Sequence, residues 1–293
     1  MQENTNTNTA APSIPAKGLH RMTDRAYFAI DLPSSSQTKV LATSTNAHLG
    51  WQREHPEDET DALTVGAYLH ALLLQPQSIK FDFVVVPKVD RRTTAGKQEW
   101  AAAQAEADKR GARLINDQQV GLAEAMAGSA IKHKGVSAIL RSCAQREIVA
   151  IGDIAGRPAK CKIDGLLPAK GGGNSVCIVD VKTTISASAR DFSRSVISYG
   201  YAHQAAFYSR VLDSLGLVVE DFVFIAIEKE RPHCVAVFRL PDVAMGIADH
   251  RVDRLVERWW QVQAGDRTGY PEEIQELALP SWWLRGDSYT AGE

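Results

Sequence analysis

Three charged residues are spaced as a metal-assisted hydrolase would need them. Asp164 precedes a run of three glycines at 171–173, and Asp180 and Lys182 follow it. The glycines allow a tight turn midway between the two aspartates, so a hairpin would place Asp164 and Asp180 on adjacent antiparallel strands. One divalent cation could then bind both carboxylates, polarise a phosphodiester and acidify a water molecule. Lys182 would orient that water or stabilise the developing charge.

The strand that carries Asp180 and Lys182 is expected to be buried. Residues 176–181 are apolar or β-branched except for Asp180, as in a strand covered on both faces. Side chains two residues apart share a face, so Asp180 and Lys182 should point the same way, with their Cα atoms about 6.5 Å apart. The ordinary alternative is that Asp164 is a turn residue and that the other two form an ion pair at a strand end. Burial of two such charges is costly without a metal or partner, which favours the metal site.

The sequence around these residues resembles the PD-(D/E)XK nuclease signature, with Asp180 as the second acid. The segments Lys162–Gly165, Val179–Thr184 and Tyr201–Tyr208 are similar to the RecE exonuclease (exonuclease VIII) group of phage and prophage recombination nucleases, over about residues 27–285. This resemblance implies a Mg²⁺-dependent exodeoxyribonuclease, in which Mn²⁺ substitutes. It also implies degradation of linear double-stranded DNA from its ends, in the 5′→3′ direction, to leave a 3′ single strand for recombination by strand annealing.

Further site residues come from two other expected elements. His70 lies four residues after Gly66 in an expected helix over about residues 60–74. A lone histidine there is ordinarily a satisfied core residue, but the resemblance implies a metal ligand. We therefore expect His70 to join the two aspartates at the metal, with Val181 as a further ligand. Glu147 heads an expected strand and should support the metal or Lys182, unless it simply ends a surface strand.

The order of the expected elements matches the PD-(D/E)XK core. A helix is followed by three strands, a helix and two strands, which is the mixed α/β arrangement of a central sheet flanked by helices, here with an N-terminal helical elaboration. The polar residues 1–20 are expected to be a disordered tail, and residues 21–293 a single RecE-like domain. The expected core elements are the helix 60–74, the strands 147–151, 159–166 and 176–182, the helix 192–215, and the strands 221–228 and 233–240.

Two sets of residues are candidates for DNA contact. Tyr201, Gln204 and Tyr208 form one stripe of the helix after the site. Aromatic residues at this spacing are usually core, but the resemblance implies that the stripe lies beside the active site and contacts DNA. A basic cluster is the second candidate, although such a cluster is ordinarily a solvated face. Its members are Arg91, Arg92 and Lys97.

Composition excludes several classes of protein. No run of about 18 apolar residues is present, and the polar N-terminus lacks the apolar segment of a signal peptide, so a cytoplasmic protein of a bacterium or a phage-infected host is expected, without membrane contact. The four cysteines are scattered without a CxxC pair and predict neither disulfides nor a zinc site. The net charge of −2 gives no global sign of nucleic-acid binding.

The resemblance also implies partners, and it leaves two rival functions open. Relatives form homo-oligomeric rings, here expected to be a trimer or tetramer, and work with a RecT-like single-strand annealing protein. One rival is a PD-(D/E)XK endonuclease, which would cut closed circles. The other is a catalytically inactive DNA-binding scaffold of the same fold, and the presence of Asp164, Asp180 and Lys182 argues against it.

Overall fold

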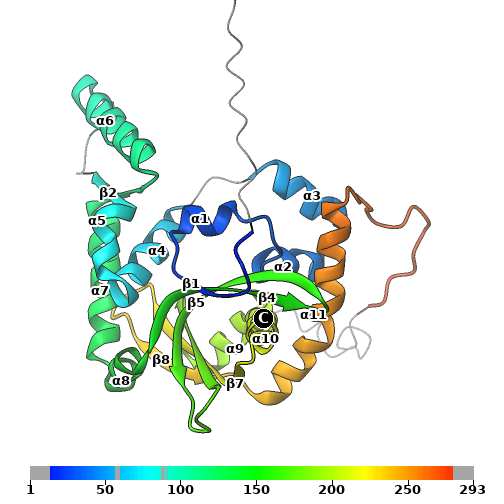
Figure 1. The fold of residues 1–293 in the computed structure, drawn as a ribbon. Helices are drawn as coiled ribbons and strands as arrows, with labels where there is room; N and C mark the ends of the chain where they lie inside the picture. Colours follow the sequence, from blue (N-terminus) through cyan, green and yellow to red (C-terminus); the bar gives the residue numbers. More distant parts are fainter. Residues whose placement is uncertain (1–13, 57–59, 87–89, 91, 280–293) are drawn as a thin grey trace, which may run out of the picture.

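A computed structural model describes residues 14–56, 60–86, 90 and 92–279, and a six-stranded sheet runs through its centre (Figure 1). The strand order is β1–β4–β5–β6–β7–β8, and only the β6–β7 pair is parallel. The helices α9 and α10 connect that pair, because parallel neighbours need a crossover. The fold is therefore the predicted mixed α/β sheet flanked by helices. Its strands are β1 (Gly18–His20), β4 (Gln145–Ile154), β5 (Arg157–Pro168), β6 (Ser175–Thr184), β7 (Val218–Glu228) and β8 (Val235–Arg239).

Two helical layers cover the sheet, and each encloses its own apolar core. Ile178 of β6 belongs to the core under one layer, whereas Val179 and Val181 belong to the core under the other. This alternation confirms that β6 is buried on both faces. Figure 1 shows the two layers on opposite sides of the sheet. The first contains α9 (Ala189–Ser198), α10 (Tyr201–Asp213) and α11 (Asp242–Gln263), and the second contains α4 (Asp61–Leu74), α7 (Asp117–Lys132) and α8 (Lys134–Ser142).

The N-terminal segment is more ordered than the sequence predicted. Residues 18–20, which were expected within a disordered tail, form β1 and pair with β4 in antiparallel register. Backbone hydrogen bonds to β4 hold these residues in place. Such bonds do not depend on side chains, so they produce no periodic pattern in the sequence. Buried Lys160 donates from Nζ to the backbone carbonyls of Tyr27 and Ile30, which fixes the chain after β1 against β5. The predicted N-terminal helical elaboration consists of α1 (Asp24–Ala29), α2 (Ser35–Thr43) and α3 (Asn46–Glu54).

The predicted hairpin and the first predicted helix are both present. β5 and β6 pair in antiparallel register, with Gly165 opposite Val179, so Asp164 and Asp180 lie on adjacent strands. The helix α4 follows Thr60, whose side chain accepts from the Leu63 N–H as an N-cap. The predicted helix over 192–215 is instead two helices, α9 and α10. Gly200 separates them with a φ of +65°, a left-handed conformation that interrupts the helix.

A small second sheet stands beside the main one. Its strands β2 (Phe83–Val86) and β3 (Arg113–Asn116) are parallel, and α6 (Thr94–Arg110) makes the crossover between them. A 3-10 turn (Pro76–Ser78) and α5 (Ile79–Asp82) lead into β2 from α4. Figure 1 shows α6 and β2 beyond α4 and α7, away from the central sheet. Among the described residues, no helix combines the length and apolar character that crossing a membrane requires.

Candidate metal centre and its cleft

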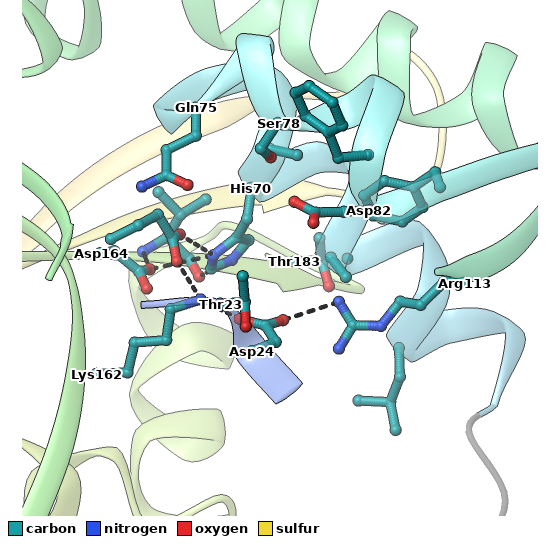
Figure 2. A pocket seen from close by; sticks show the side chains of 18 of the residues that line it. Thr23, Asp24, His70, Gln75, Ser78, Asp82, Arg113, Lys162, Asp164 and Thr183 are labelled. Carbon is teal, nitrogen blue, oxygen red and sulfur yellow. Dashed lines mark hydrogen bonds and ion pairs between the residues drawn. The ribbon is translucent and has the colours of Figure 1, made fainter. Parts of the chain in front are cut away.

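A cavity of about 730 Å³ opens where α4 and the small sheet face β4, β5 and β6. Four elements contribute predicted site residues to its walls. These residues are His70 of α4, Glu147 of β4, Asp164 of β5, and Val181 and Lys182 of β6. The segment before α1 and the start of β3 close the other side. Figure 2 shows His70 and Asp164 directed toward each other inside this cavity. The topology therefore brings residues from distant parts of the chain to one cleft.

His70, Glu147 and Asp164 form the densest cluster of possible metal ligands in the described part of the chain. One ligand atom of each lies within 4.8 Å of the other two. His70 Nδ1 is 3.4 Å from Asp164 Oδ2 and 3.7 Å from Glu147 Oε1. Glu147 is buried, with 8% of its surface exposed, so it is not the surface strand end that the sequence left open. Instead, it contributes the second carboxylate of the cluster.

Local backbone irregularities aim the two carboxylates. Glu147 has a φ of +49°, and the β4–β5 ladder has no pair at this position, between Arg146↔Gly165 and Ile148↔Ile163. On β5, Asp164 Oδ2 accepts a hydrogen bond of 2.7 Å from the Val181 N–H, so its side chain meets the neighbouring backbone. A strand that departs from regular pairing often re-aims a side chain beside a functional site.

The electrostatics of the cluster favour a cation. Burial alone would lower the pKa of His70, but the charges of Asp164 and Glu147 outweigh it and raise that pKa to about 10. Burial also opposes ionisation of Asp164, yet the charges of His70 and Lys182 lower its pKa to about 2. Asp164 therefore remains ionised, and the proton of His70 balances part of the charge of the cluster.

The donor set fits Mg²⁺ or Mn²⁺. Two carboxylates supply hard oxygen ligands, and an imidazole shifts the preference toward Mn²⁺. His70 Nε2–H donates to the Val181 carbonyl at 3.0 Å, which leaves Nδ1 facing the carboxylates. A backbone acceptor of this kind fixes the orientation of a metal-binding imidazole. The Val181 carbonyl, also a predicted ligand, has a second lone pair beyond the one used by His70.

Asp180 stands apart from this cluster. Its Oδ2 is 2.6 Å from Lys182 Nζ, and its Oδ1 accepts from Gln204 at 2.6 Å. The expected shared face of Asp180 and Lys182 is thus observed, and the second oxygen of Asp180 is bound by Gln204 of α10. Burial opposes the charge of Lys182, but Asp180 and Asp164 raise its pKa, so Lys182 is a stable cation.

The predicted DNA-contacting stripe of α10 is only partly accessible. Tyr201 lines the cavity and lies under Lys182, with Nζ 4.8 Å from the ring centre. Gln204 is half-buried and engaged with Asp180. Tyr208 differs from the expectation: it is buried in the core between sheet and helices, beside Phe222, so its ring offers no surface to DNA in this structure. Its aromatic size explains this position, because such rings dominate cores.

The predicted basic cluster lies outside the cavity. Arg92 is exposed and forms a two-point ion pair with Asp90, and Lys97 is exposed on α6. Arg91 lies outside the described residues.

Three charged cavity residues that are linked to one another, Asp24, Arg113 and Lys162, were not among the predicted site residues. Lys162 Nζ lies 2.5 Å from Glu147 Oε2 and 2.5 Å from Asp24 Oδ1, and Arg113 donates to Asp24 Oδ2 at 3.0 Å. Lys162 could have been found, because it lies two residues before Asp164 and must share its face. For Asp24 and Arg113, the sequence carries no such signal.

Comparisons with known proteins agree on the fold. Residues 34–278 match a family model described as "PDDEXK-like domain of unknown function (DUF3799)". A crystal structure of a candidate exonuclease from Eubacterium rectale is similar, with a TM-score of 0.58 and 17% identity, over 94% of this chain and 100% of that chain. At this identity the likeness shows the fold alone. A search among curated proteins gave no match.

Two further structures match more weakly. The protein VC1899 from Vibrio cholerae is 13% identical over 85% of this chain and 63% of its own, with a TM-score of 0.23. The protein SSO0001 is 16% identical over 70% of this chain and 89% of its own, with a TM-score of 0.29. Scores this low support no argument.

Proposed function

The chain belongs to the PDDEXK-like domain family, and on that premise we propose that it is a divalent-metal-dependent deoxyribonuclease. One observation carries the proposal: two carboxylates, an imidazole and a partly buried ammonium group from four separate elements share one open cavity. Packing alone does not require such a set, because each buried charge costs free energy unless it is paired. A phosphodiester, which carries one negative charge, suits a cavity that offers a cation beside a metal site.

Each residue has a role in this proposal. His70, Glu147 and Asp164 would hold Mg²⁺ or Mn²⁺, and the bound ion would supply charge stabilisation and an acidified water. Lys182 stays protonated, so it stabilises negative charge at the phosphate and orients the water instead of removing a proton. Asp180 fixes the position of Lys182, and it remains a predicted metal ligand that would have to turn from Lys182 to serve.

We further propose, from the resemblance to RecE nucleases, that the enzyme degrades linear duplexes from their ends, 5′→3′. The same resemblance supports a ring-shaped trimer or tetramer, a RecT-like annealing partner and a cytoplasmic location. Light scattering of the purified protein tests the assembly, and a mass of one chain would contradict it.

The test of the nuclease function compares a linear duplex with a covalently closed circle of the same sequence, each with Mg²⁺ and with a chelator. We expect complete loss of the linear substrate in Mg²⁺, an intact circle and no reaction in chelator. Cutting of the circle would support an endonuclease instead. No cleavage of either substrate in Mg²⁺ or Mn²⁺ would overturn the nuclease function.

A further inference from the structure

Next to the metal cluster, the cavity holds two cations that share one carboxylate. Asp24, the first residue of α1, receives Lys162 Nζ at its Oδ1 and Arg113 Nη1 at its Oδ2. These three residues come from the segment before the core, from β5 and from the small sheet. Figure 2 shows Asp24 between the two basic side chains. A single carboxylate therefore links three separate parts of the fold across the cleft.

All three side chains can be reached from the cavity. Their exposed fractions are 37% for Asp24, 28% for Arg113 and 24% for Lys162, and each lines the cavity wall. The contact is therefore not sealed in the core, and Asp24 can turn outward without unfolding α1. Each pair is only partly buried and opens to the cavity, so a competing anion can replace the carboxylate without leaving either cation unpaired.

A phosphate of the DNA backbone offers Lys162 and Arg113 the same kind of partner as the Asp24 carboxylate. A phosphodiester presents one negative charge on two free oxygens, as Asp24 does, and a lysine with an arginine is a common pair for binding it. Lys162 also contacts Glu147, so this position adjoins the metal cluster. Arg113 belongs to β3, outside the central sheet, so a phosphate bound by both cations lies on the side of the metal cluster that faces the small sheet.

We propose that Arg113 and Lys162 form a second phosphate subsite for the DNA backbone, which Asp24 occupies until nucleic acid displaces it. This rests on the proposed nuclease function and specifies how that site engages its substrate. The subsite lies between β5 of the central sheet and β3 of the small sheet, so it directs the DNA strand across the cavity.

A double-mutant cycle tests the competition. Asp24→Asn keeps the side-chain shape but removes the charge, and we expect it to tighten binding of a short duplex about tenfold in metal-free, low-salt buffer. In an Arg113→Gln background, that gain should shrink to the small general effect of removing any acid from the cavity. Asp82→Asn, at another acid of the cavity wall, measures the general effect. An equal gain in both backgrounds would overturn the proposal.

Asp242→Asn is the matched structural control. Asp242 is also the first residue of a helix, α11, and it also pairs with an arginine, Arg239, but it does not line the cavity. Its substitution should leave DNA affinity unchanged. A gain as large as that of Asp24→Asn would show that the effect does not come from the cavity, and it would overturn the subsite.

Neutral linkages in the DNA locate the contact. A series of duplexes, each with one methylphosphonate, should contain a linkage that weakens binding to the wild type about tenfold but does not weaken binding to Arg113→Gln. Identical profiles for the two proteins would overturn the subsite while leaving the nuclease function standing. A wild-type protein that binds no duplex under any metal condition would instead overturn the nuclease function.

Discussion

At the scale of single residues, the proposed mechanism requires Lys182 to keep its proton beside the phosphate. We predict that Lys182→Ala slows cleavage by roughly two to three orders of magnitude, as for removal of other single electrostatic groups. The substitution also leaves the buried Asp180 carboxylate without its ammonium partner, so circular dichroism must first show that the variant is folded. Single-turnover degradation of a labelled linear duplex in saturating Mg²⁺ measures the effect.

Two further variants give this experiment its controls. Lys182→Arg should not restore the rate, because a planar guanidinium on a longer stem cannot take the position of a compact ammonium. Lys170→Ala removes an exposed lysine outside the cavity and should cleave at the wild-type rate. A near wild-type rate for Lys182→Ala would exclude its catalytic role.

The second prediction at this scale concerns Glu147. We expect Glu147→Gln to weaken Mn²⁺ binding about 10- to 100-fold, because one of two carboxylates in the cluster loses its charge. Calorimetric titration of the metal measures the affinity without requiring cleavage. Glu257→Gln, in an exposed ion pair with Arg157, is the matched control and should bind Mn²⁺ as the wild type does. Equal affinities for both variants would remove Glu147 from the ligand set.

The sequence predicted the types of residue at the site better than their arrangement. The spacing of Asp164, Asp180 and Lys182 follows from strand pairing, which is a regular geometry. The positions of Asp180 and Glu147 relative to the cluster do not follow, because they depend on a positive φ at Glu147 and on Gln204 of α10, which binds the carboxylate of Asp180. The spacing of residues along the sequence predicts neither effect.

At the scale of elements, the contact between β4 and α10 keeps the site in place, since these elements carry Glu147 and Gln204. A Cβ atom added at Gly152 would lie 2.6 Å from the backbone carbonyl of Val211, which cannot move without shifting α10. We predict that Gly152→Ala destabilises the protein by about 1–3 kcal/mol, measured by denaturant unfolding. Gly121→Ala, in an open and exposed position of α7, should instead stabilise it by about 0.5–1 kcal/mol. Destabilisation by both variants alike would contradict the packing argument.

The contact between α2 and α10 should make stability depend on pH. His203 Nε2 lies 2.9 Å from Thr38 Oγ1, and burial together with the charge of Lys39 lowers the pKa of His203 from 6.5 to about 4. Between these values the unfolded chain binds more protons, so the contribution is complete above pH 6.5 and is lost as the pH falls toward 4.

Unfolding free energies of the wild type and His203→Gln, measured from pH 7 to pH 4, isolate this effect. The wild type should lose on the order of 3 kcal/mol more than the variant. His250→Gln, at an exposed histidine of α11, should follow the wild-type curve. Parallel curves for wild type and His203→Gln would contradict the shifted pKa.

The elements that the sequence missed share one physical cause. β1 and β3 are three and four residues long, too short for a periodic pattern, and each depends on pairing with a distant strand. The break at Gly200 was different, because a glycine before Tyr201 is a local signal for the end of a helix. Long, buried strands such as β6 were found because their composition alone predicts them.

At the scale of the whole molecule, the cleft lies between two parts of the fold that are far apart in the sequence but adjacent in space. The central sheet supplies the metal cluster and Lys182, and the small sheet with the segment before α1 supplies the opposite wall. The order of the core elements was predictable from the sequence because it is a sequence of long, patterned segments. The opposite wall was not, since it depends on Arg113 and Asp24 meeting across 89 residues of chain.

The most direct test of the metal centre is cleavage of a linear duplex by the wild type and by Asp164→Asn, as Mg²⁺ is titrated into metal-free protein. The account predicts that the wild type is inactive without metal and gains activity with saturable dependence on Mg²⁺. Asp164→Asn, which loses the carboxylate between His70 and the Val181 N–H, should stay inactive at every concentration. Cleavage by Asp164→Asn at the wild-type rate, or by the wild type in chelator, would contradict the metal centre proposed here.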